Sequence, residues 1–285
     1  MDISSLENEQ IRSVGGESVV FETIKELKLD SKFEVLGFNQ PFIEAAIGVI
    51  AARLLAPASE RATHLWLKND TALDDLMETS FEPLSQDRVY RVSDMLLGNK
   101  DKIESHLQNH ERHLFNLDEK ILLYDLTNTF FEGSGKYNKK ARFGVSKEKR
   151  SDCPLVTLGL LMDGDGFPKK SEVFEGNISE AGTLQNILSK ISTATENPVI
   201  VTDAGISTQE NIKWLADNEY KYVVVSRKRK KKIPEDNKMV KVREDDRRVI
   251  KAALRTCDDG EIEVCCHSSA KEIKERDKNS LREAF

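Results

Sequence analysis

The stretch Pro198-Val-Ile-Val-Thr-Asp-Ala-Gly205 decides the fold, because a run of residues typical of a buried strand ends on a carboxylate and then breaks at a glycine. The earlier stretch Ile121-Leu-Leu-Tyr-Asp125 repeats this pattern of an apolar run that delivers an aspartate. Asp125 and Asp203 are thus expected at or near the ends of two core strands. Since parallel strands present their active groups at their carboxyl ends, we expect both carboxylates in one site.

Two aspartates close together can bind divalent metal ions. Their oxygens are the ligands that Mg²⁺ or Mn²⁺ prefers, and two such ions can activate water and stabilise the leaving oxygen at a phosphodiester. Aspartate at a strand end is also a common turn former or helix cap, so each acid taken alone leaves a structural role open. Thr127 and Asn128, which follow Asp125, either orient its carboxylate or a bound water, or cap the turn.

The segments around these acids predict a mixed α/β sheet. Strands are expected over 120–131, 154–162, 170–175, 198–203 and 220–226, and helices over 182–191 and 208–218. The turn Asp163-Gly-Asp-Gly166 joins the second and third strands as an antiparallel hairpin. The order strand, hairpin, helix, strand, helix, strand predicts a mixed sheet with helices packed on it.

The chain before these strands predicts a mostly helical region. Apolar periodicity and caps favour helices over 40–56, 59–67, 71–76, 85–97 and 101–115, whereas residues 1–30 predict a weakly ordered or strand-like start. His106, His110 and His113 lie on one side of the last of these helices. Because no carboxylate or cysteine partner is nearby, a surface that faces solvent or a partner is favoured over a metal site.

Composition excludes several classes of protein. No stretch approaches the roughly 20 apolar residues of a membrane span, and the start is not a secretory signal, so we expect a cytoplasmic protein. The four cysteines form no CxxC pair and are too few for a disulfide framework. The net charge of -6 argues against a uniformly basic nucleic-acid binder.

Positive charge is nevertheless concentrated in residues 136–150, which hold seven Lys or Arg and the single acid Glu148. Because this run follows the Asp125 strand and includes Tyr137 and Phe143, which can stack, we expect a polyanionic substrate to lie there. A solvated face is the alternative for any charge run. The candidate DNA contacts are Lys136, Lys139, Lys140, Arg142, Lys147, Lys149 and Arg150. A second basic block, 227–232, is better explained as a flexible connector.

Three domains follow from these patterns. Residues 1–116 form a mostly helical domain that is a candidate for DNA binding, and residues 117–227 form the first part of the mixed-sheet core. Residues 228–285 alternate in short hydrophobic and polar steps and predict a β-rich segment that ends in a charged helix over 271–285.

Several motifs occur in a fixed order along the chain: Leu123-Tyr-Asp-Leu-Thr-Asn-Thr-Phe-Phe-Glu132, Lys140-Ala-Arg-Phe-Gly144, Leu158-Gly-Leu-Leu-Met162, Val201-Thr-Asp-Ala-Gly-Ile-Ser207 and Tyr222-Val-Val-Val-Ser-Arg227. Taken together, they resemble the insertion-sequence DDE transposases that carry a β-rich insertion domain inside a ribonuclease H-like core. The resemblance implies a DNA transposase that acts on the terminal inverted repeats of its own element with two divalent metals, Mg²⁺ or Mn²⁺, and is a homo-oligomer in its full-length form. It assigns Asp125 and Asp203 as the first and second catalytic, metal-binding aspartates.

The third acid of that family is a glutamate in a pattern of Tyr, Arg three residues on, Glu four further and Lys seven further. None of the five tyrosines has Arg three residues later. We therefore expect a C-terminally truncated, inactive or partial product whose sheet is incomplete and marginally stable. Two alternatives stay open: a non-catalytic DNA-binding regulator of a full-length transposase, and an unrelated metal-dependent phosphohydrolase.

Overall fold

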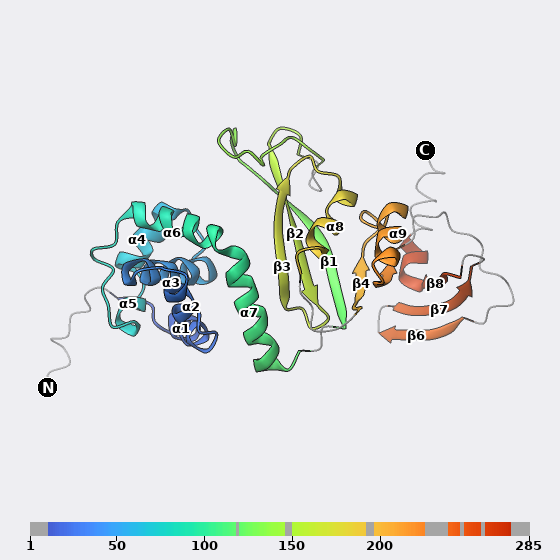
Figure 1. Cartoon of the computed structure of the whole chain (residues 1–285), viewed down its shortest axis with the longest axis horizontal. Coiled ribbons are helices and arrows are strands. Elements are labelled where there is room, and N and C mark those ends of the chain that lie inside the picture. Colours follow the sequence, from blue (N-terminus) through green and yellow to red (C-terminus); the bar gives the residue numbers. More distant parts are fainter. Residues whose placement is uncertain are drawn as a thin grey trace. The chain divides into compact units, whose positions relative to one another are not determined.

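The computed structural model describes residues 11–117, 120–145, 150–191, 197–225, 239–245, 248–257 and 260–274 (Figure 1). The chain divides into two compact units, Met1–Ser226 and Arg227–Phe285. Helices come first, a mixed sheet follows, and a smaller antiparallel sheet comes last. This order confirms the predicted α+β fold class.

The helical region is built around the apolar helix α3. Its elements are α1 (Gly15–Glu26), α2 (Leu29–Val35), α3 (Gln40–Leu55), α4 (Glu60–Asn69), α5 (Leu73–Leu76), α6 (Gln86–Gly98) and α7 (Lys100–Phe115). Asn39 caps α3 by accepting a hydrogen bond from the Phe42 amide, and Pro41 stands in its first turn. Small residues such as Ala45 and Ala46 are fully buried in α3, which lets its neighbours approach closely.

The prediction for residues 1–30 was wrong from residue 15 onward, where α1 and α2 form in place of a strand-like start. Ile24 and Phe33 are buried in the same core as α3, so tertiary burial stabilises these short helices. The strand-like element is limited to a bridge between Ser13 and Thr71. Residues 1–10 lie outside the described residues.

Five strands form the sheet of the first unit, in the order β3-β2-β1-β4-β5. They are β1 (Ile121–Phe130), β2 (Leu155–Asp163), β3 (Pro168–Glu175), β4 (Val199–Thr202) and β5 (Lys221–Val224). β1, β4 and β5 run parallel. β2 pairs with β1 as an antiparallel strand, and β3 pairs with β2 in the same way. The predicted hairpin turn is confirmed, since the amides of Asp165 and Phe167 donate to the carboxylate of Asp163.

One face of this sheet is closed by helices. Leu122, Tyr124 and Ile200 are buried there against α8 (Leu184–Leu188) and α9 (Gln209–Asp217). Alternate residues of β1 point to the other face, where the burial of its side chains is lower. Asp125, which follows Tyr124, is therefore directed away from the packed core.

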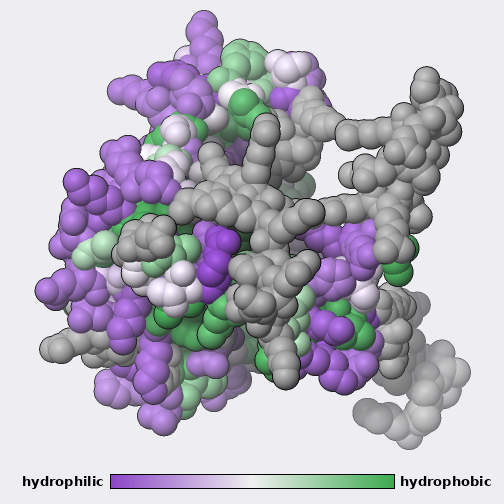
Figure 2. Space-filling view, turned by 90° about the vertical axis from the view of Figure 1, so that its right-hand side faces the viewer, coloured by the Kyte–Doolittle hydropathy of each residue, from purple (hydrophilic) through white to green (hydrophobic). Residues whose placement is uncertain are grey.

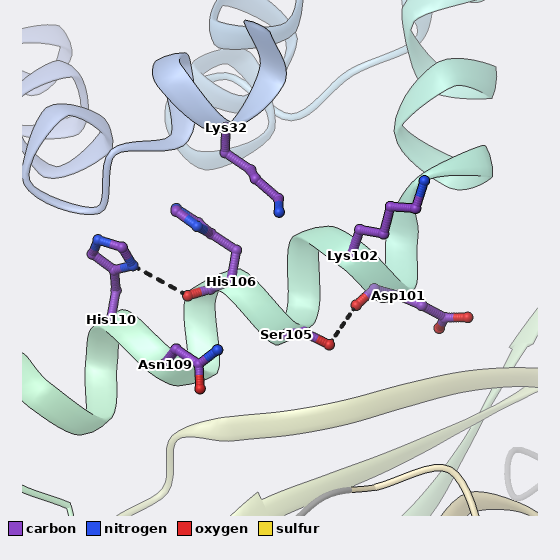
Figure 3. A pocket seen from close by; sticks show the side chains of 7 residues that line it. All are labelled: Lys32, Asp101, Lys102, Ser105, His106, Asn109 and His110. Carbon is purple, nitrogen blue, oxygen red and sulfur yellow. Dashed lines mark hydrogen bonds between the residues drawn. The ribbon is translucent and has the colours of Figure 1, made fainter. Parts of the chain in front are cut away.

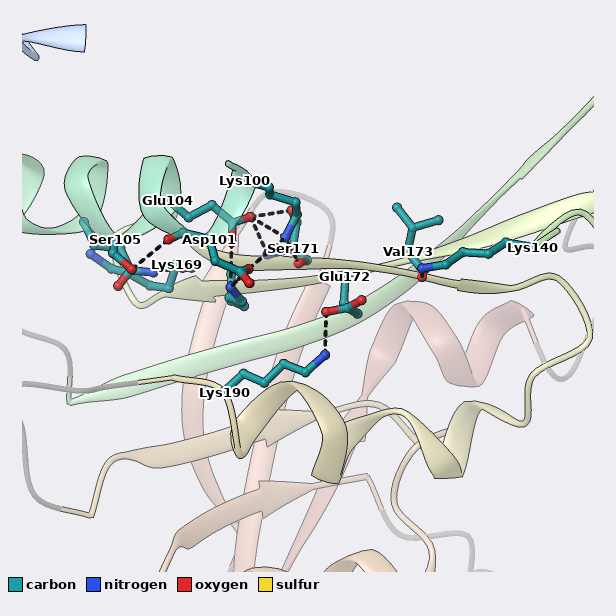
Figure 4. A network of polar contacts seen from close by, with 12 residues as sticks. Lys100, Asp101, Glu104, Ser105, Lys140, Lys169, Ser171, Glu172, Val173 and Lys190 are labelled. Carbon is teal, nitrogen blue, oxygen red and sulfur yellow. Dashed lines mark hydrogen bonds and ion pairs between the residues drawn. The ribbon is translucent and has the colours of Figure 1, made fainter. Parts of the chain in front are cut away.

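Helix α7 contacts β3 through charged groups (Figure 4). Lys170 of β3 places its Nζ 2.5 Å from Asp101 Oδ1 and 2.9 Å from Glu104 Oε2, and the Ser171 hydroxyl donates to Glu104. Burial by itself would raise the pKa of Glu104, but the hydrogen bonds from Ser171, Lys170 and Lys100 lower it below its usual value. A polar network thus joins the helical region to the sheet.

Lys169, the residue before Lys170, forms a buried ion pair with Asp163. Lys169 Nζ is 3.2 Å from Asp163 Oδ2, and the two side chains are 5% and 0% exposed. Glu111 of α7 lies nearby; burial raises its pKa, and the charge of Asp163 adds to this effect while Lys169 opposes it. The hairpin end of β2 and β3 therefore carries compensated charges in a dry environment.

The second unit has an antiparallel sheet of β6 (Val240–Asp245), β7 (Arg248–Thr256) and β8 (Ile262–Ser268), in the order β6-β7-β8. The expected β-rich character of this segment is thus present. Of the predicted helix over 271–285, residues 275–285 lie outside the described residues.

The surface matches the composition, in which 32% of the residues are charged. On the face shown in Figure 2, hydrophilic side chains cover most of the coloured area and hydrophobic ones form small separate patches. In the described part of the chain, no single helix is long and apolar enough to cross a membrane. Helices α3 and α4 meet that criterion only as a pair bent by 101°.

Candidate active site and basic loop

The register of β1 and β4 brings the two predicted acids together. Leu123 pairs with Val201 and Tyr124 with Thr202, so Asp125 and Asp203 are the next residues on two adjacent parallel strands. Neighbouring strands lie about 4.8 Å apart, and both aspartates are exposed. The register therefore puts Asp125 and Asp203 at neighbouring positions of the two chain segments.

The position of Asp125 within its strand differs from the prediction. It was expected at or near the end of its strand, yet β1 continues to Phe130 because Asp125 and the residues after it pair with β2, beginning with Leu160. What ends at Tyr124 is only the parallel pairing with β4. The two aspartates thus lie where β4 ends, next to the middle of β1.

Asp203 begins a tight turn that fixes its side chain. Its Oδ1 accepts hydrogen bonds from the amides of Gly205 at 2.9 Å and Ile206 at 3.2 Å, and its carbonyl accepts from the hydroxyl of Ser207. Asp125 Oδ1 likewise accepts from the amide of Leu126 at 2.8 Å. Each carboxylate uses Oδ1 for the backbone, which leaves Oδ2 as the oxygen to meet a ligand.

A third carboxylate, that of Glu180, lies beside this turn. A Cβ at Gly205 would collide with Glu180 Oε2 and would lie 3.2 Å from Asp203 Oδ1. Both oxygens are therefore within 3.2 Å of one point, and only glycine leaves that point free. Sequence reasoning missed Glu180; the one signal for a close approach was the glycine two residues after Asp203.

The buried side chain of Asn211 joins the two turns that carry Glu180 and Asp203. Its Nδ2 donates to the carbonyls of Ala181 at 2.7 Å and Ile206 at 2.8 Å, and its Oδ1 accepts from Gln185 at 3.2 Å. The residue is 2% exposed. Because both carbonyls depend on one amide, Asn211 sets the spacing between the short helix η2 (Glu180–Gly182) and the Asp203 turn.

The side chain of Asn128 contacts the basic segment and β2. Its Nδ2 donates to the carbonyl of Val145 at 2.9 Å, and its Oδ1 accepts from the hydroxyl of Thr157 at 3.2 Å. It therefore ties the end of the basic segment to β1 and β2.

Tyr124, next to Asp125, is buried, and this burial raises its pKa to about 12, so its phenol stays protonated.

The basic segment forms a loop that is hydrogen-bonded to the sheet. The amide of Arg142 donates to the carbonyl of Leu155, the amide of Leu155 donates back, and the amide of Gly176 donates to the carbonyl of Lys140. A Cβ at Gly144 or at Gly176 would collide with backbone of the neighbouring segment. The loop thus lies against the end of β3 and the start of β2, past the carboxyl end of β1.

The residues predicted to contact DNA make different contacts within the protein. Lys140 donates its Nζ to the carbonyl of Val173, and Lys136 lies over the ring of Tyr137. Lys139 is exposed, and Arg142 is anchored through its backbone. Lys147 and Lys149 lie outside the described residues, as does the second basic block.

Arg150 is engaged by acids of its own loop. Its guanidinium makes two hydrogen bonds to Asp152, at 2.7 and 2.8 Å, and its NH1 lies 3.5 Å from Glu132. It also lies 4.8 Å from the centre of the Phe130 ring. Hydrogen bonding to Asp152 raises the pKa of Arg150 and lowers that of Asp152. Arg150 therefore closes the loop onto β1 in the structure.

The donors at the site suit a hard divalent cation, because Asp125 and Asp203 offer carboxylate oxygens on an exposed face. In the described part of the chain, no group of three or more His, Cys, Asp or Glu residues is arranged to hold a metal ion. By the chemistry of their oxygens, the two exposed carboxylates fit Mg²⁺ or Mn²⁺.

The fold is thus a mixed sheet with helices on one face and two aspartates at neighbouring positions of adjacent parallel segments. More specifically, the chain belongs to the family described as "Transposase DDE domain", which residues 116–269 match. This membership removes the alternative of an unrelated phosphohydrolase. Among curated proteins, none matches the chain.

Among solved structures, the chain is similar to a piggyBac transposase in a synaptic complex with hairpin DNA. The two share 12% sequence identity with a TM-score of 0.38. The match covers 80% of this chain and 52% of that chain, so this chain spans about half the length of that transposase.

Proposed function

We propose that the chain acts as a DNA transposase of an insertion sequence, with strand cleavage and transfer at the terminal inverted repeats of its own element. The placement of Asp125 and Asp203 at the same level of two adjacent parallel strands carries this proposal. Family membership supports the class of reaction. The partners proposed with it are the DNA of those repeats and further copies of the protein.

The two aspartates are proposed to hold Mg²⁺ or Mn²⁺ through their Oδ2 atoms. When bound, the ions supply activation of an attacking water and stabilisation of the leaving oxygen of a phosphodiester. The protein keeps the two carboxylates aligned, since backbone amides of Leu126, Gly205 and Ile206 fix both Oδ1 atoms.

The basic loop is proposed to guide the DNA toward this site. Phe130 follows Asp125 by five residues of extended strand, which corresponds to roughly 17 Å. One strand of a duplex advances about 3.4 Å per nucleotide, so the loop would meet phosphates about five nucleotides from the reacting bond. Lys136 and Lys139, which have no acidic partner in the described part of the chain, are the best candidates for these contacts.

The missing third acid favours a second candidate function. The tyrosine, arginine, glutamate and lysine pattern does not occur in these residues, so we propose that they cleave DNA weakly or not at all by themselves. The product would then bind the ends as a regulator of a complete transposase. We also propose the domains expected from the sequence: a helical 1–116, a core 117–227 and a β-rich 228–285.

Cleavage of a plasmid that carries the inverted repeats tests the catalytic proposal. With Mg²⁺ or Mn²⁺, any nicking by the wild-type protein should fall at least a hundredfold in Asp125→Asn and in Asp203→Asn. Asp217→Asn, an exposed aspartate of α9, is the matched control. Nicking that survives both site variants would disprove the assignment, and end binding without nicking by the wild type would select the regulator.

A further inference from the structure

An open groove of about 500 Å³ runs between α2 and α7, in the helical region and away from the paired aspartates. Lys32 enters it from α2, and Lys102, His106 and His110 enter it from α7 (Figure 3). The three α7 residues recur at intervals of four, which places them on one face of the helix. His113 does not line the groove.

The groove gathers groups that carry or can gain positive charge. In Figure 3, the Lys32 side chain extends from α2 toward α7 and ends between His106 and Lys102. The rings of His106 and His110 are 4.4 Å apart between centroids. In the described part of the chain, neither Lys32 nor Lys102 has an acidic side chain within ion-pair distance. Such a set of like charges is unfavourable unless an anion joins it.

The one acid among the lining residues, Asp101, is engaged elsewhere. Its Oδ1 lies 2.5 Å from Lys170 Nζ, and Figure 3 shows its carboxylate directed away from Lys32. The hydrogen bond from Lys170 lowers the pKa of Asp101 below its usual value. Asp101 is therefore the counter-ion of the sheet contact and does not neutralise the groove.

Hydrogen bonds orient both histidines. His106 Nε2 lies 2.8 Å from the carbonyl of Leu27, and His110 Nδ1 lies 3.3 Å from the carbonyl of His106. Because a carbonyl only accepts, these two nitrogens carry the hydrogens. The remaining nitrogens, His106 Nδ1 and His110 Nε2, gain a hydrogen only on protonation, and each then becomes a second donor.

We infer that this groove binds a phosphate group of the DNA backbone between Lys32, Lys102 and the two histidines. The inference rests on the proposed function for its DNA partner. A phosphate oxygen accepts hydrogen bonds from ammonium and imidazolium donors, and the amide of Asn109 is a further donor in the groove. The groove is open along the surface, which suits a phosphate that belongs to a polymer.

Binding should depend on pH through His106. Burial lowers its pKa, and the charges of His110 and Lys32 lower it further, against the hydrogen bond to Leu27. A phosphate dianion or diester favours the protonated ring, so it raises this pKa. Binding therefore strengthens as pH falls from about 8 to about 6.

The test uses the whole chain with a duplex of the inverted repeat and, separately, with inorganic phosphate. Binding to the duplex is measured across salt concentrations for the wild type, for Lys32→Ala/Lys102→Ala, and for Arg61→Ala/Lys213→Ala as a control with equal loss of charge. We expect about tenfold weaker binding and a salt slope smaller by about one only in the groove variant. NMR titration of the His106 ring in the wild type, which requires no variant to fold, should show a raised pKa with the duplex.

The outcomes separate the two proposals. Equal binding by the groove variant and its control, with an unmoved His106, overturns the groove inference and leaves the proposed function intact. A His106 shift with inorganic phosphate but not with the duplex also overturns it, because the groove would then serve a free anion. Loss of nicking in Asp125→Asn with an intact His106 response supports both.

Discussion

The Oε2 atom of Glu180 occupies the space that a side chain at Gly205 would need. This contact joins residues that are 25 positions apart and brings a third carboxylate next to Asp203. Because the end of a glutamate side chain moves easily, a substitution that displaces Glu180 should change activity much more than the free energy of unfolding.

Gly205→Ala should displace the Glu180 carboxylate from Asp203. The free energy of unfolding should change by less than about 1 kcal/mol, because a flexible side chain yields. Nicking or metal affinity should fall about tenfold, as in Glu180→Ala, and the double variant should lose no more. Gly182→Ala, with open space around its Cβ, is the control. Additive losses in the double variant would show that the two residues act separately.

Asn211→Ala should loosen both turns. It leaves the carbonyls of Ala181 and Ile206 without their shared donor, at a cost of about 2 kcal/mol in the free energy of unfolding. Urea denaturation measures this cost against Asn186→Ala, an exposed asparagine of α8. If the two variants are equally stable, the amide does not hold the turns together.

Lys169→Met should destabilise the hairpin end of the sheet by about 3 kcal/mol, because it leaves the Asp163 carboxylate buried without its cation. Lys139→Met, at an exposed lysine of the basic loop, should change stability by less than about 0.5 kcal/mol. Denaturant midpoints compare the two. A small effect at Lys169 would mean that water reaches the pair.

The contact between α7 and β3 should weaken in acid. The pKa values of Asp101 and Glu104 are lowered in the folded state, so the stability that they contribute is present above their unfolded values, near pH 4, and is lost as pH falls. Lys170→Met should remove much of this dependence between about pH 5 and pH 3. Denaturation at several pH values checks it, and an unchanged slope in the variant would contradict the assignment.

Local patterns were enough to find the strands and the two aspartates. The apolar runs before Asp125 and Asp203 mark buried strands, and their positions in the β3-β2-β1-β4-β5 sheet agree with the predicted order. The prediction for the start of the chain was wrong because α1 and α2 are stabilised by burial of residues such as Phe33 against α3. A window of a few residues does not contain this contact.

By itself, the sequence determined where the strands of the mixed sheet and the helices after residue 40 lie and which acids end the apolar runs, since these depend on residues within a few positions. Only the tertiary structure decided which distant groups meet. The pairing of Tyr124 with Thr202 aligns the two aspartates, Asn211 ties the Glu180 and Asp203 turns, and α7 sets His106 opposite Lys32. These contacts follow from strand register and helix packing, which minimise exposed apolar area over the whole unit and are not encoded in any one segment.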